Sequence, residues 1–313
     1  TFQRTTMGAS LCRRDDSTDA EAFPEAKGQV GPLSKESFIV LKRSGVKMPV
    51  FGLGTWLAKP EDLAVEACLA AWKDGYKMID TAALYENEEA IGKALKEIKA
   101  NRSEYFIVTK LHCDRHGFQQ AIDELKVSCA KLGLKYVDLF LIHSPKGGKV
   151  IETWKGLIEA KKMGLTRAIG VSNFGVEHLK QLNKHKLEMP DVNQIELHVW
   201  NHQNESVAYM DEEGIAVMGY CPLARVKRFG ETCVSKVAKD LKKTEAQIAI
   251  RWSLQKGIIT IPKSTNKKRI RENGDVFGWN IPDGIMKTLD DAHEGFQASN
   301  SVNNMKLPWK EVK

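Results

Sequence analysis

The chain has 313 residues and a formal net charge of +7, and its hydrophobic (42%) and charged (28%) fractions are ordinary for a globular protein. This length suits one large domain or two ordinary ones, and the composition excludes collagen-like and coiled-coil proteins. No apolar run approaches the ~18–20 residues that a membrane span requires, so we predict a soluble protein without a membrane partner.

The first 36 residues differ from the rest of the chain. Thr1 to Arg14 carries arginines and no acidic residue, whereas Asp15 to Glu25 is acidic, and no apolar periodicity links the two stretches. We therefore predict a disordered tail over residues 1–36 and a single domain over residues 37–313. The arginine-rich start resembles an organelle transit peptide, although the acidic stretch weakens that interpretation.

The cysteines and the basic residues narrow the class of protein further. Six cysteines lie far apart, mostly in apolar segments, which favours reduced thiols and a cytoplasmic protein, with organelle targeting left open. The basic residues are dense only between Lys263 and Arg271. No zinc-ligand spacing or RNA-binding aromatic pattern accompanies them, so we predict no nucleic-acid partner and no metal site.

From Ser37 onward, short apolar runs alternate with stretches of helical periodicity. Phe38–Leu41 and Val50–Phe51, on either side of a Ser44-Gly45 turn, predict a short opening hairpin. Eight predicted strands follow, with seven helical segments between them and a helix from Lys267; the strands are 51–54, 77–80, 105–110, 137–143, 168–172, 192–196, 216–220 and 258–262. Parallel neighbours need helical crossovers, so we predict an α/β protein with a (β/α)8 TIM barrel.

A doubly wound open sheet is the main alternative to the barrel. Such a fold places a glycine-rich dinucleotide fingerprint directly after its first strand. The segment at that place, Gly52-Leu53-Gly54-Thr55, lacks the third glycine and is not followed at once by a helix. We therefore reject the Rossmann interpretation.

Polar residues gather where the predicted strands end, which is where barrel enzymes place their chemistry. The strand ends and following loops carry Thr55, Trp56, Asp80, Tyr85, Lys110, His143, Ser172, Asn173, Gln194, Glu196, Tyr220, Lys263 and Ser264. Each of these residues, taken alone, also fits a structural role. The group as a whole predicts an active site at this end of the barrel.

Four of these residues suit proton donation to a carbonyl oxygen. A tyrosine phenol has a pKa of about 10, and a nearby ammonium lowers it. Lys110 would supply that charge beside Tyr85 if Asp80 compensates the burial of the ammonium. His143 would add a hydrogen bond to the same carbonyl oxygen. We expect Lys110 to lower the pKa of Tyr85.

Seven segments in order carry a resemblance to a known family. They are Gly52–Trp56, Ile79–Glu88, Val108–Leu111, Asp138–His143, Ile169–Phe174, Asn193–His198 and Ile261–Ser264. Together they resemble the aldo-keto reductase superfamily over essentially all of the chain from Ser37.

The resemblance implies a catalytic tetrad of Asp80, Tyr85, Lys110 and His143, with Tyr85 as general acid, and a cofactor, NADP(H). In the family, Ser172, Asn173 and Gln194 match residues that hydrogen-bond the nicotinamide carboxamide, and Tyr220 matches the ring that stacks on it. Lys263, Ser264 and Arg269 match binders of the 2′-phosphate, and Asn273 matches a residue that contacts the adenine. The further cofactor-binding positions that the resemblance implies are Gly54, Thr55, Leu223 and Thr265.

Two positions depart from the family pattern in the expected substrate pocket. His112 and Ser144 stand where many members carry tryptophan. Trp56 would be the remaining aromatic wall of a wider or more polar pocket for a small-molecule carbonyl substrate, an aldehyde or a ketone. The family is mostly monomeric, and we predict a monomer.

Two other functions stay open at this stage. The chain could be an NADPH-binding regulatory protein that resembles potassium-channel β subunits, because such subunits keep the tetrad. It could also be a barrel glycosidase that uses Asp80 and Glu196 as paired carboxylates.

Overall fold

The computed structural model describes residues 32–230 and 232–308. Of the disordered tail predicted for residues 1–36, residues 1–31 therefore lie outside the described residues. Within residues 32–36, Leu33 contacts the core and Lys35 Nζ donates a hydrogen bond to Asp74 O at 2.6 Å. The boundary at Ser37 stays a prediction.

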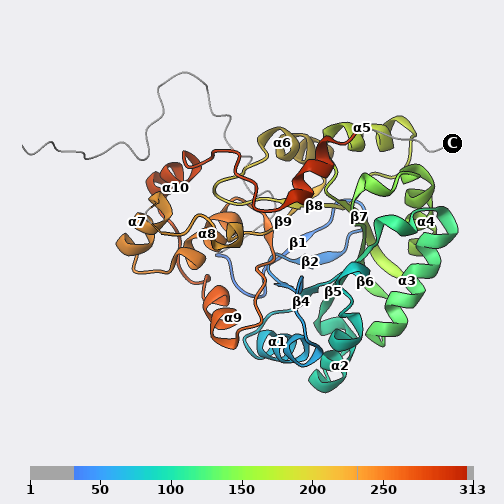
Figure 1. Cartoon of the computed structure of the whole chain (residues 1–313), viewed down its shortest axis with the longest axis horizontal. Helices are drawn as coiled ribbons and strands as arrows, with labels where there is room; N and C mark the ends of the chain where they lie inside the picture. Colours follow the sequence, from blue (N-terminus) through green and yellow to red (C-terminus); the bar gives the residue numbers. More distant parts are fainter. Residues whose placement is uncertain (1–31, 231, 309–313) are drawn as a thin grey trace, which may run out of the picture.

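Eight parallel strands follow one another around the sheet in chain order. They are β3 (Leu53–Gly54), β4 (Met78–Asp80), β5 (Phe106–Leu111), β6 (Val137–Ile142), β7 (Thr166–Ser172), β8 (Val192–Glu196), β9 (Ala216–Tyr220) and β10 (Ile259–Thr260). Parallel bridges from Phe51 to Thr260 and from Gly54 to Lys263 join the two ends of the sheet. The (β/α)8 barrel is confirmed, and each strand overlaps one of the predicted runs (Figure 1).

The opening hairpin is present, but its second strand is not where the sequence predicts it. β1 (Phe38–Val40) pairs with β2 (Lys47–Pro49), and Val50 N extends this pairing by donating to Ser37 O at 3.1 Å, whereas Val50 O accepts a hydrogen bond from Thr260 N at 2.9 Å. The second hairpin strand therefore lies three residues earlier than predicted, Val50 joins it to the barrel wall, and Phe51 belongs to that wall through its bridge to Thr260. Figure 1 shows β1 and β2 across the centre of the ring of strands.

Helices cover the outside of the barrel. They are α1 (Glu61–Lys73), α2 (Glu88–Ile98), α3 (Phe118–Leu132), α4 (Val150–Lys162), α5 (Val176–Lys184), α6 (Asn204–Glu213), α7 (Cys233–Asp240), α8 (Glu245–Gln255), α9 (Lys267–Gly274) and α10 (Asp283–Asp290). One helix follows each strand from β3 to β8, while two, α7 and α8, follow β9, so the crossover from β9 to β10 holds one helix more than predicted. No helix in residues 32–230 and 232–308 is both long and apolar enough to cross a membrane.

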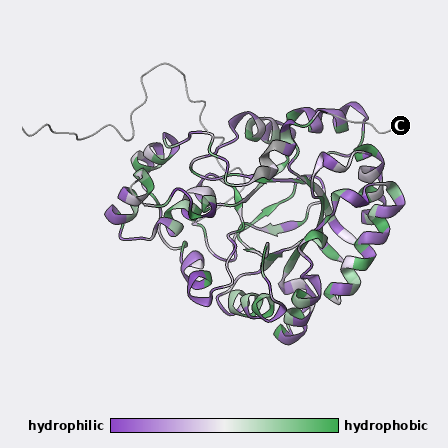
Figure 2. Ribbon diagram, in the orientation of Figure 1, coloured by the Kyte–Doolittle hydropathy of each residue, from purple (hydrophilic) through white to green (hydrophobic). Residues whose placement is uncertain are grey.

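The hydrophobic residues form two layers. Met78, Val108, Leu139 and Met218 pack inside the barrel together with Met48 of the hairpin, which closes the amino end of the barrel. A larger cluster lies between the strands and the helices. Figure 2 shows the strands mostly hydrophobic and the outer faces of the helices mostly hydrophilic. The carboxyl end of the barrel is thereby left for polar residues.

One buried carboxylate ties three neighbouring strands together. Asp138 on β6 is fully buried and accepts hydrogen bonds from Ile107 N of β5 at 2.8 Å and from Arg167 Nη1 of β7 at 2.8 Å. Arg102 Nη2 adds a third contact at 2.6 Å. Both carboxylate oxygens are thus paired, as burial of the charge requires.

We predict that Asp138→Ala lowers the free energy of unfolding by about 3 kcal/mol, because a buried N–H and two guanidinium groups lose their acceptor. Urea unfolding measures the change. Asp123→Ala is the control, since the contacts of Asp123 with Gln119 Nε2 at 3.0 Å and Lys126 Nζ at 3.7 Å are both exposed. Equal stability of the two variants would contradict the assigned role of Asp138.

Candidate active site

A cavity of about 560 Å³ lies at the carboxyl end of the strands. It is lined by most of the residues predicted for the site: Gly54, Thr55, Trp56, Asp80, Tyr85, His143, Ser172, Asn173, Gln194, Tyr220, Leu223, Lys263, Ser264, Thr265, Arg269 and Asn273. The cavity extends from the Asp80 and Tyr85 side to the basic residues that follow β10. The residues that line it therefore suit an extended ligand that spans from one end of the cavity to the other.

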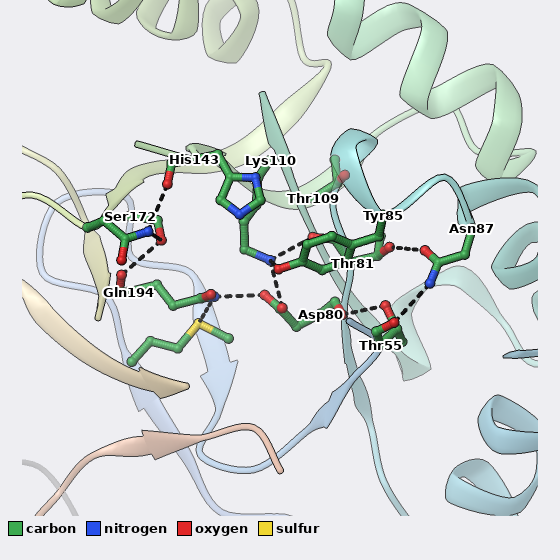
Figure 3. Close-up of polar contacts among 12 residues, drawn as sticks. Thr55, Asp80, Thr81, Tyr85, Asn87, Thr109, Lys110, His143, Ser172 and Gln194 are labelled. Atoms are coloured by element: carbon green, nitrogen blue, oxygen red, sulfur yellow. Dashed lines mark hydrogen bonds and ion pairs between the residues drawn. The ribbon is translucent and has the colours of Figure 1, made fainter. Parts of the chain in front are cut away.

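Lys110 lies behind the cavity wall, and its side chain is fully buried. Its Nζ donates to Asp80 Oδ1 at 2.7 Å, to Thr81 O at 2.8 Å and to Tyr85 Oη at 3.3 Å. The three donors of the ammonium therefore have three oxygen partners (Figure 3). Of these three partners, the Tyr85 phenol is the group that can donate a proton to a ligand in the cavity.

The barrel brings these residues together because β4 and β5 are neighbours. Asp80 ends β4 beside Val108 of β5, and Lys110 follows two residues later on the same face of β5. Tyr85 ends a short 3-10 helix, Ala83–Tyr85, and Glu86 then adopts a left-handed conformation with φ 53°. This turn places the phenol over the end of β5.

Asp80 is held by groups from both sides of the barrel. Gln194 Nε2 of β8 donates to Asp80 Oδ2 at 2.7 Å. Thr55 Oγ1 donates to Asp80 O at 2.9 Å, and Asn87 Nδ2 donates to Thr55 O at 2.9 Å. Both oxygens of the carboxylate are paired, so the buried Asp80–Lys110 ion pair is positioned by the strands that surround it (Figure 3).

Burial dominates the protonation of Tyr85. It raises the pKa of the phenol well above its usual value of 10.0, and the charge of Asp80 raises it further. Burial also lowers the pKa of Lys110, while Asp80 opposes that shift. The expectation that the pKa of Tyr85 is lowered is therefore wrong for the protein alone, because burial raises it. The phenol keeps its proton at neutral pH.

The imidazole of His143, which lies beside Tyr85, is neutral. Burial, followed by the charge of Lys110, moves its pKa well below 6.5. Its ring stands edge-on to the ring of Tyr85, with 5.6 Å between centroids. Its Nδ1 is buried and has no hydrogen-bond partner among the described residues. A neutral imidazole and a protonated phenol thus border the same part of the cavity.

A second hydrogen-bonded group joins β6, β7 and β9. Asn173 follows β7 in a left-handed conformation with φ 61°, and its Nδ2 donates to His143 O at 3.0 Å. Tyr220 Oη donates to Asn173 Oδ1 at 2.8 Å, and Ser172 Oγ donates to Gln194 O at 2.9 Å. Together with Gln194, these residues form one wall of the cavity.

The far end of the cavity is positively charged. Burial, followed by the charge of Arg269, lowers the pKa of Lys263. Neither Lys263 nor Arg269 forms an ion pair with another described residue, whereas Lys267 pairs with Glu66 at 3.1 Å. Asn266 caps α9 by accepting hydrogen bonds from Lys268 N and Arg269 N. Two cations that repel each other beside a cavity favour binding of an anion.

The predicted substrate residues divide into two groups. Trp56 lines the cavity and contacts Tyr85, with ring centroids 4.9 Å apart. His112 and Ser144 are not among the lining residues; each instead caps a 3-10 helix, Cys113–Arg115 and Pro145–Gly147. His112, Cys113 and Asp114 form the single group of metal-ligating side chains found in the described ranges, and the prediction of no metal site stays a prediction.

Several residues that line the cavity were not predicted from the sequence. Leu57 and Leu84 lie in the loops that follow β3 and β4, and this position at the strand ends could have identified them as lining residues. Ser299 and Ser301 return to the cavity from the far end of the chain, and no local pattern marks them. Glu196 does not line the cavity, which removes the geometric basis for its pairing with Asp80 in a glycosidase.

Comparisons with known proteins agree with this arrangement. A model of the aldo/keto reductase family matches residues 50–294. The chain is 39% identical to glyoxal reductase of Bacillus subtilis over 79% of this chain and 90% of that protein. It is 44% identical to methylglyoxal reductase DkgA of Yersinia pestis over 76% of this chain and 86% of that protein. A Bombyx mori aldo-keto reductase in complex with NADP has a TM-score of 0.79 at 34% identity, with 84% of this chain and 95% of that chain covered.

We predict that Lys110→Met lowers the free energy of unfolding by about 3–5 kcal/mol at pH 7, because Asp80 stays buried without a countercharge. Without Lys110, the folded-state pKa of Asp80 rises further above the unfolded value of about 3.9. The penalty is therefore present at neutral pH and shrinks as the pH falls and Asp80 takes up a proton. Denaturant unfolding at several pH values measures it, and a pH-independent loss would contradict the ion pair.

Proposed function

The chain belongs to the aldo/keto reductase family, and we propose that it reduces small aldehydes or ketones to alcohols with NADPH as the reductant. The observation that carries the proposal is the fully buried Lys110 ammonium, which contacts Asp80 and Tyr85 at one end of the cavity. The relatives named glyoxal and methylglyoxal reductase support the substrate class, and the neighbour with NADP supports the cofactor.

NADPH would lie along the cavity, with its 2′-phosphate at the basic end and its nicotinamide beside Asp80 and Tyr85. Lys263 and Arg269 would bind its 2′-phosphate, because these cations lack an ion-pair partner among the residues the structure describes. Ser172, Asn173 and Gln194 would hydrogen-bond the carboxamide; Gln194 Nε2 is committed to Asp80, which leaves Oε1 as an acceptor. When bound, NADPH supplies a hydride to the carbonyl carbon.

Tyr85 would donate the proton that completes the reaction. The carbonyl carbon gains a hydride, its oxygen takes the Tyr85 proton, and the product is the alcohol. Lys110, at 3.3 Å from the phenol oxygen, stabilises the phenolate that this transfer leaves, and a proton from solvent restores the phenol. His143, which burial and Lys110 keep neutral by holding its pKa well below 6.5, would donate an N–H hydrogen bond to the carbonyl oxygen.

Trp56 would form the aromatic wall beside the reacting carbonyl, since its ring lies against Tyr85. His112 and Ser144 would not contact the substrate directly, because both lie outside the cavity lining. The monomeric state and the cytoplasmic location remain predictions from the sequence.

We predict that Tyr85→Phe lowers the rate of carbonyl reduction about 10²–10⁴-fold, the usual contribution of a general acid. Binding of NADPH, measured by fluorescence titration, should change less than about twofold, because the ring is kept and the hydroxyl contacts Lys110 rather than the basic end. Steady-state rates with methylglyoxal, nitrobenzaldehyde, aldoses and quinones provide the readout.

Undiminished turnover in Tyr85→Phe would refute the role of the phenol. NADPH binding by the unsubstituted protein without turnover of any substrate in the panel would favour a regulatory NADPH-binding subunit instead.

We further predict that Arg269→Ala weakens binding of NADPH about 10- to 100-fold, since a hydrogen bond to a charged group contributes about 1.5–3 kcal/mol. Binding of NADH, which lacks the 2′-phosphate, should hardly change. Lys267→Ala is the matched control on the same helix, because its ammonium is already paired with Glu66. A parallel loss of NADH and NADPH affinity in Arg269→Ala would place the phosphate elsewhere.

A further inference from the structure

The last described segment of the chain crosses the mouth of the barrel. This crossing segment, residues 298–307, contains the 3-10 helix η6 (Asn300–Lys306) and contacts β8. Figure 1 shows it as the dark red helical turn beside β8. Ser299 and Ser301 of the segment line the cavity. The segment is therefore part of the wall of the active site.

A buried carboxylate holds the start of the crossing segment. Glu196, the last residue of β8, is fully buried. Its Oε1 accepts a hydrogen bond from Ala298 N at 2.5 Å, and its Oε2 accepts one from Ser299 N at 2.8 Å. His198 Nε2 lies 3.1 Å from Oε1. Both carboxylate oxygens are therefore committed to the backbone of one turn.

The end of the segment is held separately. His178 of α5 accepts a hydrogen bond from Gly175 N through Nδ1 and donates from Nε2 to Leu307 O at 2.9 Å. A Cβ at Gly175 would lie 2.2 Å from Met305 O, so the backbone of the segment packs directly on this glycine. With both ends fixed on the barrel, the position of the intervening turn is set by Glu196 on one side and His178 on the other.

The turn held by Glu196 contacts Tyr220. Ser299 and Ser301 line the cavity together with Tyr220, and their side chains oppose the rise that burial causes in the pKa of its phenol, so both side chains lie close to it. Tyr220 Oη in turn donates to Asn173 Oδ1 at 2.8 Å. The loop after β9 is tied to the same region by Arg228, whose guanidinium pairs with Glu294 at 2.8 Å. A displacement of the turn would therefore reach Tyr220 and the Asn173 side of the cavity.

We propose that Glu196 is a positioning residue for the nicotinamide: it fixes Ser299 and Ser301, which hold the Tyr220 ring on which the nicotinamide stacks. The proposal rests on the proposed function, because it requires NADPH to lie against Tyr220. A carboxylate suits this place better than an amide, since two N–H groups converge on two acceptor oxygens. Glutamine would present its NH₂ group to one of them.

The test uses Glu196→Gln, the double variant Ser299→Ala/Ser301→Ala, and Glu177→Gln as control, since Glu177 forms only an exposed pair with Lys180. Hydrogen exchange across the crossing segment in the protein without NADPH should accelerate about tenfold in Glu196→Gln and remain unchanged in Glu177→Gln. In the double variant it should accelerate only at Ser301, whose N–H loses the Ser299 hydroxyl as its acceptor. The double variant and Glu196→Gln should both bind NADPH about tenfold more weakly and show a lower kcat, with the KM for carbonyl changed less than about twofold.

Unchanged exchange in Glu196→Gln would overturn the proposal, because the carboxylate would then not hold the segment. Faster exchange with unaltered NADPH affinity and kcat would overturn it too, by reducing Glu196 to a structural tether. If Glu196→Gln does not fold, wild-type NADPH affinity and kcat in the double serine variant are sufficient to reject the link to Tyr220. Failure of the unsubstituted protein to bind NADPH would reject the proposed function instead, and the exchange measurement remains independent of it.

Discussion

Burial of one ammonium group, that of Lys110, sets the requirements for the whole mouth of the barrel. A charge without solvent needs a countercharge and a partner for each donor. Asp80 on the neighbouring strand supplies the countercharge, and Thr81 O and Tyr85 Oη complete the set. Asp80 then needs its own second partner, which comes from Gln194 across the barrel. The ion pair therefore links strands that are distant in sequence.

The same burial decides how Tyr85 acts. Loss of solvation raises the pKa of the phenol, so the group enters the reaction with its proton in place. The contribution of Lys110 comes after proton transfer, when a phenolate 3.3 Å from the ammonium replaces a neutral phenol. The arrangement thus favours the charge distribution that follows donation over a phenol that is already ionised at rest.

The sequence was sufficient for features that depend on local pattern or neighbouring strands. Apolar runs located all eight barrel strands, and strand ends located the Asp80–Lys110 pair. Long-range contacts were not accessible in this way: Ser299 and Ser301 reach the cavity only through the fold, and Val50 joins the barrel by pairing with Thr260. The direction of the Tyr85 pKa shift also needed the structure, because spacing shows the nearby charge but not the extent of burial.

The most direct test of the central claim is an NMR titration of Tyr85 with ¹³Cζ-labelled tyrosine, the signal being assigned by its absence in Tyr85→Phe. The phenol should keep the chemical shift of its protonated form beyond pH 10, the usual pKa of tyrosine being about 10. Lys110→Met should move its titration to still higher pH, since the phenolate loses its neighbouring charge. Titration of Tyr85 near neutral pH, or a titration that Lys110→Met leaves in place, would contradict the account.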